Sequence, residues 1–164
     1  MKTAGWDRLH WMWAGWLGLV KGLMLLQHVV LLGARWWVAQ AFFLSGLTKL
    51  HDWETTLALF ETEYQVPILS PEWAAYAGTA GELFLPVMLA LGLGTRFAAM
   101  GLSVVNGVAV LSLMEVALPA LQQHQLWGSW LLAVAIWGPG ALSVDRWLAP
   151  WLGRRYGLKG ARAE

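Results

Sequence analysis

Long apolar stretches, separated by short polar ones, dominate the chain. A helix needs about 20 mostly apolar residues to cross the hydrocarbon core of a membrane. Four stretches meet or approach this length, and they begin near Gly33, Pro71, Thr95 and His124. A proline at the start of a stretch suits the first turn of a helix. The pattern predicts an all-α membrane protein whose central part, residues 33–145, is a bundle of four transmembrane helices.

The apolar segment from His10 to Leu32 needs a separate interpretation. Joined to the first span, it would form a helix of about 40 residues, roughly 60 Å long and twice the thickness of the membrane core. A second span would have to reverse direction within Gly33 and Ala34, which is sterically implausible. We therefore predict that residues 1–32 form an N-terminal interfacial helix, with Lys21 and His28 on its polar side.

The C-terminal end is basic and amphipathic. After Gly138-Pro139-Gly140, which would end the fourth span, the sequence DRWLAPWLGRR predicts a short helix interrupted at Pro150. Ser143 or Asp145 would cap it, because short polar side chains accept hydrogen bonds from the first backbone N–H groups of a helix. We expect this amphipathic helix and the basic tail, residues 146–164, on the cytoplasmic face, with arginines at anionic head groups.

Basic residues are distributed on one side of this four-span arrangement. Ten of the eleven lysines and arginines fall at the two termini or between spans two and three, and Lys49 alone falls on the other side. Lys49 is followed by Asp52, Glu54, Glu61 and Glu63. Cytoplasmic loops of membrane proteins carry an excess of basic residues. The distribution therefore predicts a multi-pass protein with both termini in the cytoplasm.

Composition narrows the function classes. The chain is 58% hydrophobic and 13% charged, and its thirteen tryptophans suit membrane interfaces, so lipid is a predicted partner. The absence of cysteine excludes disulfides, thiol chemistry, iron–sulfur clusters and cysteine-ligated zinc or haem. A net charge of +1 without a basic stripe excludes nucleic acid as a partner. Gly18 and Gly22 fit the G-x-x-x-G spacing of helix dimers, which leaves a homo-oligomer open.

Polar residues within the spans are the candidates for chemistry, because an ionisable group inside a membrane is costly. Glu82 lies near the middle of span two, and Asn106 lies at a similar depth on span three. Ser45 and Lys49 share one face of span one. These residues predict a polar ligand pocket in which Glu82 carries a proton or anchors a ligand and Lys49 is its cationic partner. The alternative is structural: a protonated Glu82 and Asn106 would hydrogen-bond neighbouring helices.

Two further interpretations concern the outer face. Lys49 could extend its side chain to the head groups and pair with Asp52 or Glu63 there. His51 and His124 are both expected at the outer surface near acidic residues, and imidazole with carboxylate suits zinc, copper or iron. No short His spacing supports that metal site, and no histidine falls at midspan for a haem.

The chain resembles the DoxX family of small bacterial membrane proteins. The resemblance rests on FFLSGLTKL at 42–50, LFETEYQVP at 59–67, TAGELFLPVMLALGLGTRFAA at 79–99, HQLW at 124–127 and GPGALSVD at 138–145. It implies a four-span bundle in a bacterial inner membrane, and the segment before Gly33 lies outside the shared core. The residues that match the family pattern are Arg35, Ser45, Lys49, Glu63, Pro67, Glu82, Pro86, Arg96, His124, Trp127 and Asp145. In this pattern Arg96 joins the predicted pocket, and Trp127 joins an outer-face polar cluster with His51, Glu63 and His124.

Three hypotheses for function follow. The family name comes from a subunit of a quinone-linked oxidoreductase, which implies a quinone-associated or redox-linked accessory component with quinone as the cofactor. The alternative is a non-catalytic membrane anchor or assembly partner for another protein. The resemblance links this alternative to metal stress or peptide modification. The third is a metal binder through His51 and His124. Whether the chain is an enzyme is left open.

Overall fold

The computed structural model describes residues 4–113 and 116–156, which form six helices and no sheet. The helices are α1 (Ala4–His51), α2 (Trp53–Thr62), α3 (Pro71–Leu91), α4 (Thr95–Ser112), α5 (Leu118–Trp137) and α6 (Val144–Tyr156). The all-helical prediction is therefore confirmed. Three of these helices are long and apolar enough to cross a membrane: α1 from Leu9 to His51, α3 and α4. The fourth predicted span, from His124, forms the later part of α5, which begins six residues earlier at Leu118 and carries three glutamines and His124 in its first half.

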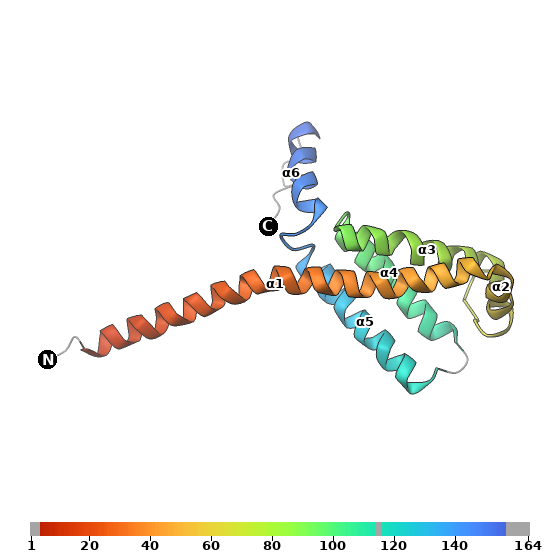
Figure 1. Cartoon of the computed structure of the whole chain (residues 1–164), viewed down its shortest axis with the longest axis horizontal. Coiled ribbons are helices and arrows are strands. Elements are labelled where there is room, and N and C mark those ends of the chain that lie inside the picture. Colours follow the sequence, from red (N-terminus) through yellow and green to blue (C-terminus); the bar gives the residue numbers. More distant parts are fainter. Residues whose placement is uncertain (1–3, 114–115, 157–164) are drawn as a thin grey trace.

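Helices α1, α3, α4 and α5 pack together as a bundle (Figure 1). α1 lies against α3 and α5, and α4 completes the arrangement by contacting α3 and α5. The core is made of fully buried side chains from all four helices, namely Val38, Leu89, Ala98, Leu102, Leu131 and Val134. A Cβ at Gly101 would stand 2.8 Å from the Leu85 Cδ1 methyl group, so a larger residue there would require the Leu85 side chain to move. Small residues are common between helices in membranes.

The N-terminal prediction is wrong in one respect, because α1 is a single continuous helix of 48 residues. It passes through Gly33 without a break. One glycine inside a helix costs only about 1 kcal/mol relative to alanine, which is too little to end a helix flanked by leucine and alanine. At 1.5 Å per residue, α1 is about 72 Å long. The predicted boundary at residues 32 and 33 is instead where packing begins, with Leu31 and Ala34 buried.

The N-terminal half of α1 extends away from the bundle (Figure 1). From Leu9 to Val30 every side chain is exposed except Val20 and His28, which are partly buried. His28 marks the first contact with the rest of the molecule, since its Nδ1 accepts a hydrogen bond from the Ala141 backbone N–H at 3.3 Å. The placement of this half on a membrane surface stays a prediction.

The connections at the two ends of the bundle correct the expected helix boundaries. α1 ends at His51, and Asp52 starts the separate helix α2 by accepting a hydrogen bond from the Thr55 backbone N–H at 3.1 Å. At the other end, α6 forms as expected but continues through Pro150. Ser143 is its cap, since its Oγ accepts from the Arg146 N–H at 3.4 Å. Of the predicted basic tail, the residues after Tyr156 lie outside the described part.

Candidate functional site

An ion pair joins α1 to α3 inside the bundle, which is one of the two roles that the sequence left open for Lys49. Lys49 Nζ lies 2.6 Å from Glu82 Oε2, with side chains 20% and 9% exposed. Lys49 also donates to Ser45 Oγ at 2.9 Å, one helical turn earlier. The two helices approach closely because Gly46 has no side chain: a Cβ there would stand 3.1 Å from Glu82 Cβ. Lys49 therefore points inward to Glu82 and does not pair with Asp52 or Glu63.

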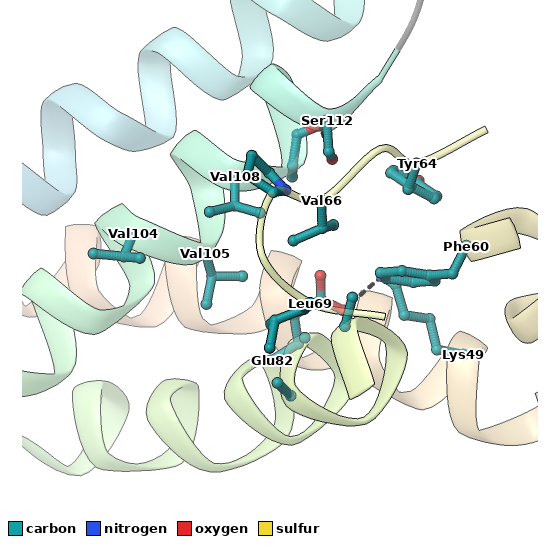
Figure 2. Close-up of a pocket in the computed structure, with 15 residues that line it drawn as sticks. Lys49, Phe60, Tyr64, Val66, Leu69, Glu82, Val104, Val105, Val108 and Ser112 are labelled. Carbon is teal, nitrogen blue, oxygen red and sulfur yellow. Dashed lines mark hydrogen bonds and ion pairs between the residues drawn. The ribbon is translucent and has the colours of Figure 1, made fainter. Parts of the chain in front are cut away.

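A cavity of about 400 Å³ adjoins this ion pair (Figure 2). Its walls come from α1, α2, α3, α4 and the segment 64–69 that links α2 to α3. The lining residues are Lys49, Phe60, Tyr64, Val66, Pro67, Leu69, Ala74, Ala77, Gly78, Glu82, Val104, Val105, Val108, Ala109 and Ser112. Lys49 and Glu82 are the charged residues of this apolar lining. Cavities of about 300–1,000 Å³ with few polar groups are typical of small-molecule sites.

Tyr64 adds a polar group to the cavity that the sequence reasoning missed. Its ring lies 4.8 Å from that of Phe60, and both rings line the cavity. Burial raises the pKa of the phenol, and the negative charges of Glu82 and Glu63 raise it further. Tyr64 is therefore a neutral hydroxyl donor at ordinary pH. The segment is fixed to the end of α4, because the Gln65 backbone N–H donates to Ser112 O at 2.8 Å.

Asn106, predicted as part of the pocket, instead connects α4 to α5. Its Nδ2 donates to the His124 backbone oxygen at 3.0 Å, and its Oδ1 lies 2.8 Å from His124 Nδ1. A carbonyl oxygen can only accept, so the amide orientation is determined and the facing Nδ1 of His124 must carry its proton. The arrangement is a structural link between helices, which is the alternative that the sequence analysis left open for Asn106.

The predicted outer-face cluster is divided in two. His124 and Trp127 face the bundle, with their rings 5.2 Å apart and Trp127 5.5 Å from Phe42 of α1. His51 and Glu63 are exposed at the ends of α1 and α2. Within residues 4–113 and 116–156, no group of three or more His, Asp or Glu side chains could hold a metal ion. The predicted metal pair, His51 and His124, thus gains no third protein ligand there.

Arg96 does not belong to the cavity either. It lies at the start of α4, exposed, and donates to the Ile136 backbone oxygen of α5 at 3.5 Å. The cavity is bordered by the other end of α4, from Val104 to Ser112. The pocket predicted from sequence therefore retains Ser45, Lys49 and Glu82, of which Ser45 acts through Lys49.

A second polar cluster, which the sequence analysis did not single out, closes the end of the bundle near Arg35. This arginine is 1% exposed and donates to the backbone oxygens of Pro139 and, at 2.6 Å, Leu142. Nearby, Asp145 accepts from the Gly94 and Thr95 backbone N–H groups at 2.7 and 2.8 Å and from Thr95 Oγ1 at 2.8 Å. Asp145 therefore caps α4, which begins fifty residues earlier in the chain. We call these residues the Arg35–Asp145 cluster.

This architecture defines a multi-pass membrane protein built on a helical bundle. A protein-family model described as DoxX matches residues 30–115, just over half of the chain, and the chain belongs to the DoxX family. The match begins where α1 starts to pack and includes Lys49, Glu82 and every lining residue of the cavity. No curated protein and no solved structure gives a significant match.

Proposed function

We propose that this DoxX family protein binds a small, neutral, membrane-soluble molecule in the cavity beside Lys49 and Glu82. The candidate ligand is a quinone, and the protein would serve as a quinone-associated, redox-linked accessory component. The observation that carries the proposal is a single ion pair at the wall of an otherwise apolar cavity. Few polar groups in an apolar cavity orient a ligand whose body is apolar and whose head is polar.

The charges of the site favour a neutral ligand. Lys49 and Glu82 compensate each other, so a charged ligand would leave one charge without a counter-charge in a region of low dielectric. The Lys49 ammonium has three N–H groups. Two of them donate to Ser45 and Glu82, which leaves the third for a ligand carbonyl. The Tyr64 hydroxyl supplies a second donor, and the Phe60 and Tyr64 rings supply faces for a planar ring.

The direct test is to purify the protein from quinone-containing membranes, extract it with organic solvent and quantify quinone per protein by mass spectrometry. We expect quinone in the wild type and its loss in Glu82→Gln and in Lys49→Met. Glu72→Gln is the matched control, because Glu72 lies on the same helix and is exposed. Recovery of no quinone from the wild type, or equal recovery from Glu82→Gln and Glu72→Gln, would overturn the proposal.

We also infer that α5 is a fourth span and that both described ends of the bundle connect to the cytoplasm as the charge distribution predicts. α5 has 20 residues, about 30 Å of helix, and packs along α4 and α1. The chain has no cysteine, so single cysteines can be introduced directly. In intact bacterial cells, Glu61→Cys should react with a membrane-impermeant maleimide and Arg155→Cys should not. The reverse labelling pattern would show that the topology is the opposite of the one inferred.

A second candidate function, an anchor or assembly partner for another protein, is favoured by the exposed N-terminal half of α1. From Leu9 to Val30 its apolar side chains lie outside the bundle. Crosslinking in native membranes, followed by purification, should then capture a defined partner that a variant lacking residues 1–27 does not. Equal capture by both forms would exclude this half of α1 as the docking element.

A further inference from the structure

The exposed part of the cavity lining comes from α3, α4 and the segment 64–69. Glu82, Ala74, Phe60 and Ser112 are buried, whereas the exposed rim consists of Ala77 on α3, Val104 (65%) and Val108 (36%) on α4, and Pro67 and Leu69 (47%) on the segment. In Figure 2, Val104 and Val108 lie on α4, on the side of the cavity opposite Lys49 and Phe60. The ion pair thus forms the inner wall, and an entirely apolar rim forms the opening.

Both helices at this opening are candidate membrane spans. Their exposed faces therefore contact hydrocarbon, and the opening faces the bilayer interior more than the aqueous phase. At the end of the bundle, α2 and the segment 64–69 contribute Phe60, Tyr64 and Val66 to the lining, and all three are buried or partly buried. A ligand that reaches the ion pair by this route has to be soluble in lipid.

We propose that the ligand is a lipid with one neutral, hydrogen-bond-accepting head group and one long hydrocarbon chain, and that it enters sideways from the bilayer. The head lies at Lys49 and Glu82. The chain leaves between Ala77 and Val104 and stays in the hydrocarbon, because a cavity of about 400 Å³ accommodates a ring but not a long prenyl chain. This inference rests on the proposed function and specifies which quinones bind: those with long polyprenyl chains.

The experiment compares one quinone head group carrying either a single isoprene unit or a long polyprenyl chain. Binding is measured in nanodiscs of quinone-free phospholipid, as the mole fraction of quinone in the lipid at half-saturation. Val104→Trp and Ala77→Trp each place a bulky ring at the opening. Val87→Trp is the matched control, since Val87 is 44% exposed on α3 but does not line the cavity. Helical circular dichroism checks that each variant folds.

We expect both rim variants to raise the half-saturating fraction of the long-chain quinone by about tenfold or more, and that of the short-chain quinone by less than about threefold. Val87→Trp should change neither. Unchanged long-chain binding in both rim variants would overturn the sideways route, and so would an equal loss of both quinones. If the wild type binds neither quinone, the proposed function fails as well. Failure of the sideways route alone differs from this outcome, because the wild type then still binds quinone.

Discussion

The two polar clusters of the bundle use similar residues in opposite ways. In the Arg35–Asp145 cluster, Arg35 is fully buried and its terminal nitrogens donate to backbone oxygens of the loop before α6. In the other cluster, Lys49 pairs directly with Glu82, beside a cavity. Arg35 does not line the cavity, and its Nε is buried without a hydrogen-bond partner in the described part of the chain. Lys49 lines the cavity, and two of its three N–H groups donate to Ser45 and Glu82.

This difference separates a structural role from a binding role. The buried Arg35 side chain holds the Pro139 and Leu142 carbonyls of the loop before α6 by part-buried hydrogen bonds, so we expect the fold to depend on Arg35. An ion pair, in contrast, can often be replaced by apolar residues of similar size without loss of stability. Charge within a membrane bundle therefore does not itself indicate a ligand site. The cavity beside Lys49 and Glu82 does.

The largest effect is expected for Arg35→Met. It leaves the Pro139 and Leu142 oxygens without their donor, and we expect the free energy of unfolding to fall by about 3 kcal/mol or more. Unfolding monitored by circular dichroism in mixed detergent micelles measures it. Arg96→Met is the matched control, because Arg96 is exposed and makes one long hydrogen bond. Equal effects of the two substitutions would remove the structural role assigned to Arg35.

Gly92→Ala tests the packing of the same cluster. Gly92 has φ of +72°, and an added Cβ would stand 2.6 Å from Ser143 Cβ and 2.9 Å from an Arg35 nitrogen. We expect a loss of about 2 kcal/mol in unfolding free energy, because strain and collision act together. Gly107→Ala, on α4 with no neighbour within 4 Å of its Cβ, should be neutral or stabilising. Similar losses at both positions would show that neither the positive φ nor the close packing at Gly92 determines the effect.

A double substitution at the cavity should change binding but not the fold. Lys49→Met combined with Glu82→Leu removes both charges together, so we expect unfolding free energy to stay within about 1 kcal/mol of the wild type, or to rise. Bound quinone should be lost. Glu82→Leu alone is the control, since it leaves the lysine without its partner. A collapse of the double variant would assign the ion pair to the fold.

The smallest effect concerns Tyr64 and alkaline pH. The folded-state pKa of Tyr64 is raised above its ordinary value of 10.0, mainly by burial and then by Glu82 and Glu63. Its contribution to stability is therefore present below pH about 10 and is lost as pH rises towards the folded-state pKa. Thermal unfolding from pH about 8 to about 11 should show a decline that is smaller in Tyr64→Phe than in Tyr76→Phe. An identical decline in the two variants would show that ionisation of Tyr64 does not contribute to the loss of stability at alkaline pH.

Much of the fold follows from local patterns. Apolar length, Pro71 at a helix start and the Gly138-Pro139-Gly140 stop each predict a helix boundary that the structure contains. The boundary at Gly33 was predicted wrongly. Membrane thickness limits the length of a span, but the continuity of a helix depends on local propensity. Leucine and alanine around Gly33 favour a helix whatever surrounds it.

The site was predictable only in part. Ser45 and Lys49 lie on one helical face, and a cation beside a buried Glu82 was one of the alternatives that the sequence offered. The structure contains that ion pair. Tyr64 could not be assigned, because it lies between helices and reaches the cavity only through the pairing of the segment 64–69 with the end of α4. Arg96 and Asn106 were assigned by depth or family pattern, neither of which specifies the neighbouring helix that a side chain contacts.

The cap of α4 has a consequence for the synthesis of the protein. Chains emerge N-terminus first, at about 5–20 residues per second. The first backbone N–H groups of α4 therefore leave the ribosome well before Asp145, which accepts from Gly94 and Thr95. Until that aspartate appears, the start of α4 relies on water or on other proteins of the insertion machinery. The cap of α4 is thus completed only when the first turn of α6 has been made, and a chain ending before residue 145 would be released with that helix end open.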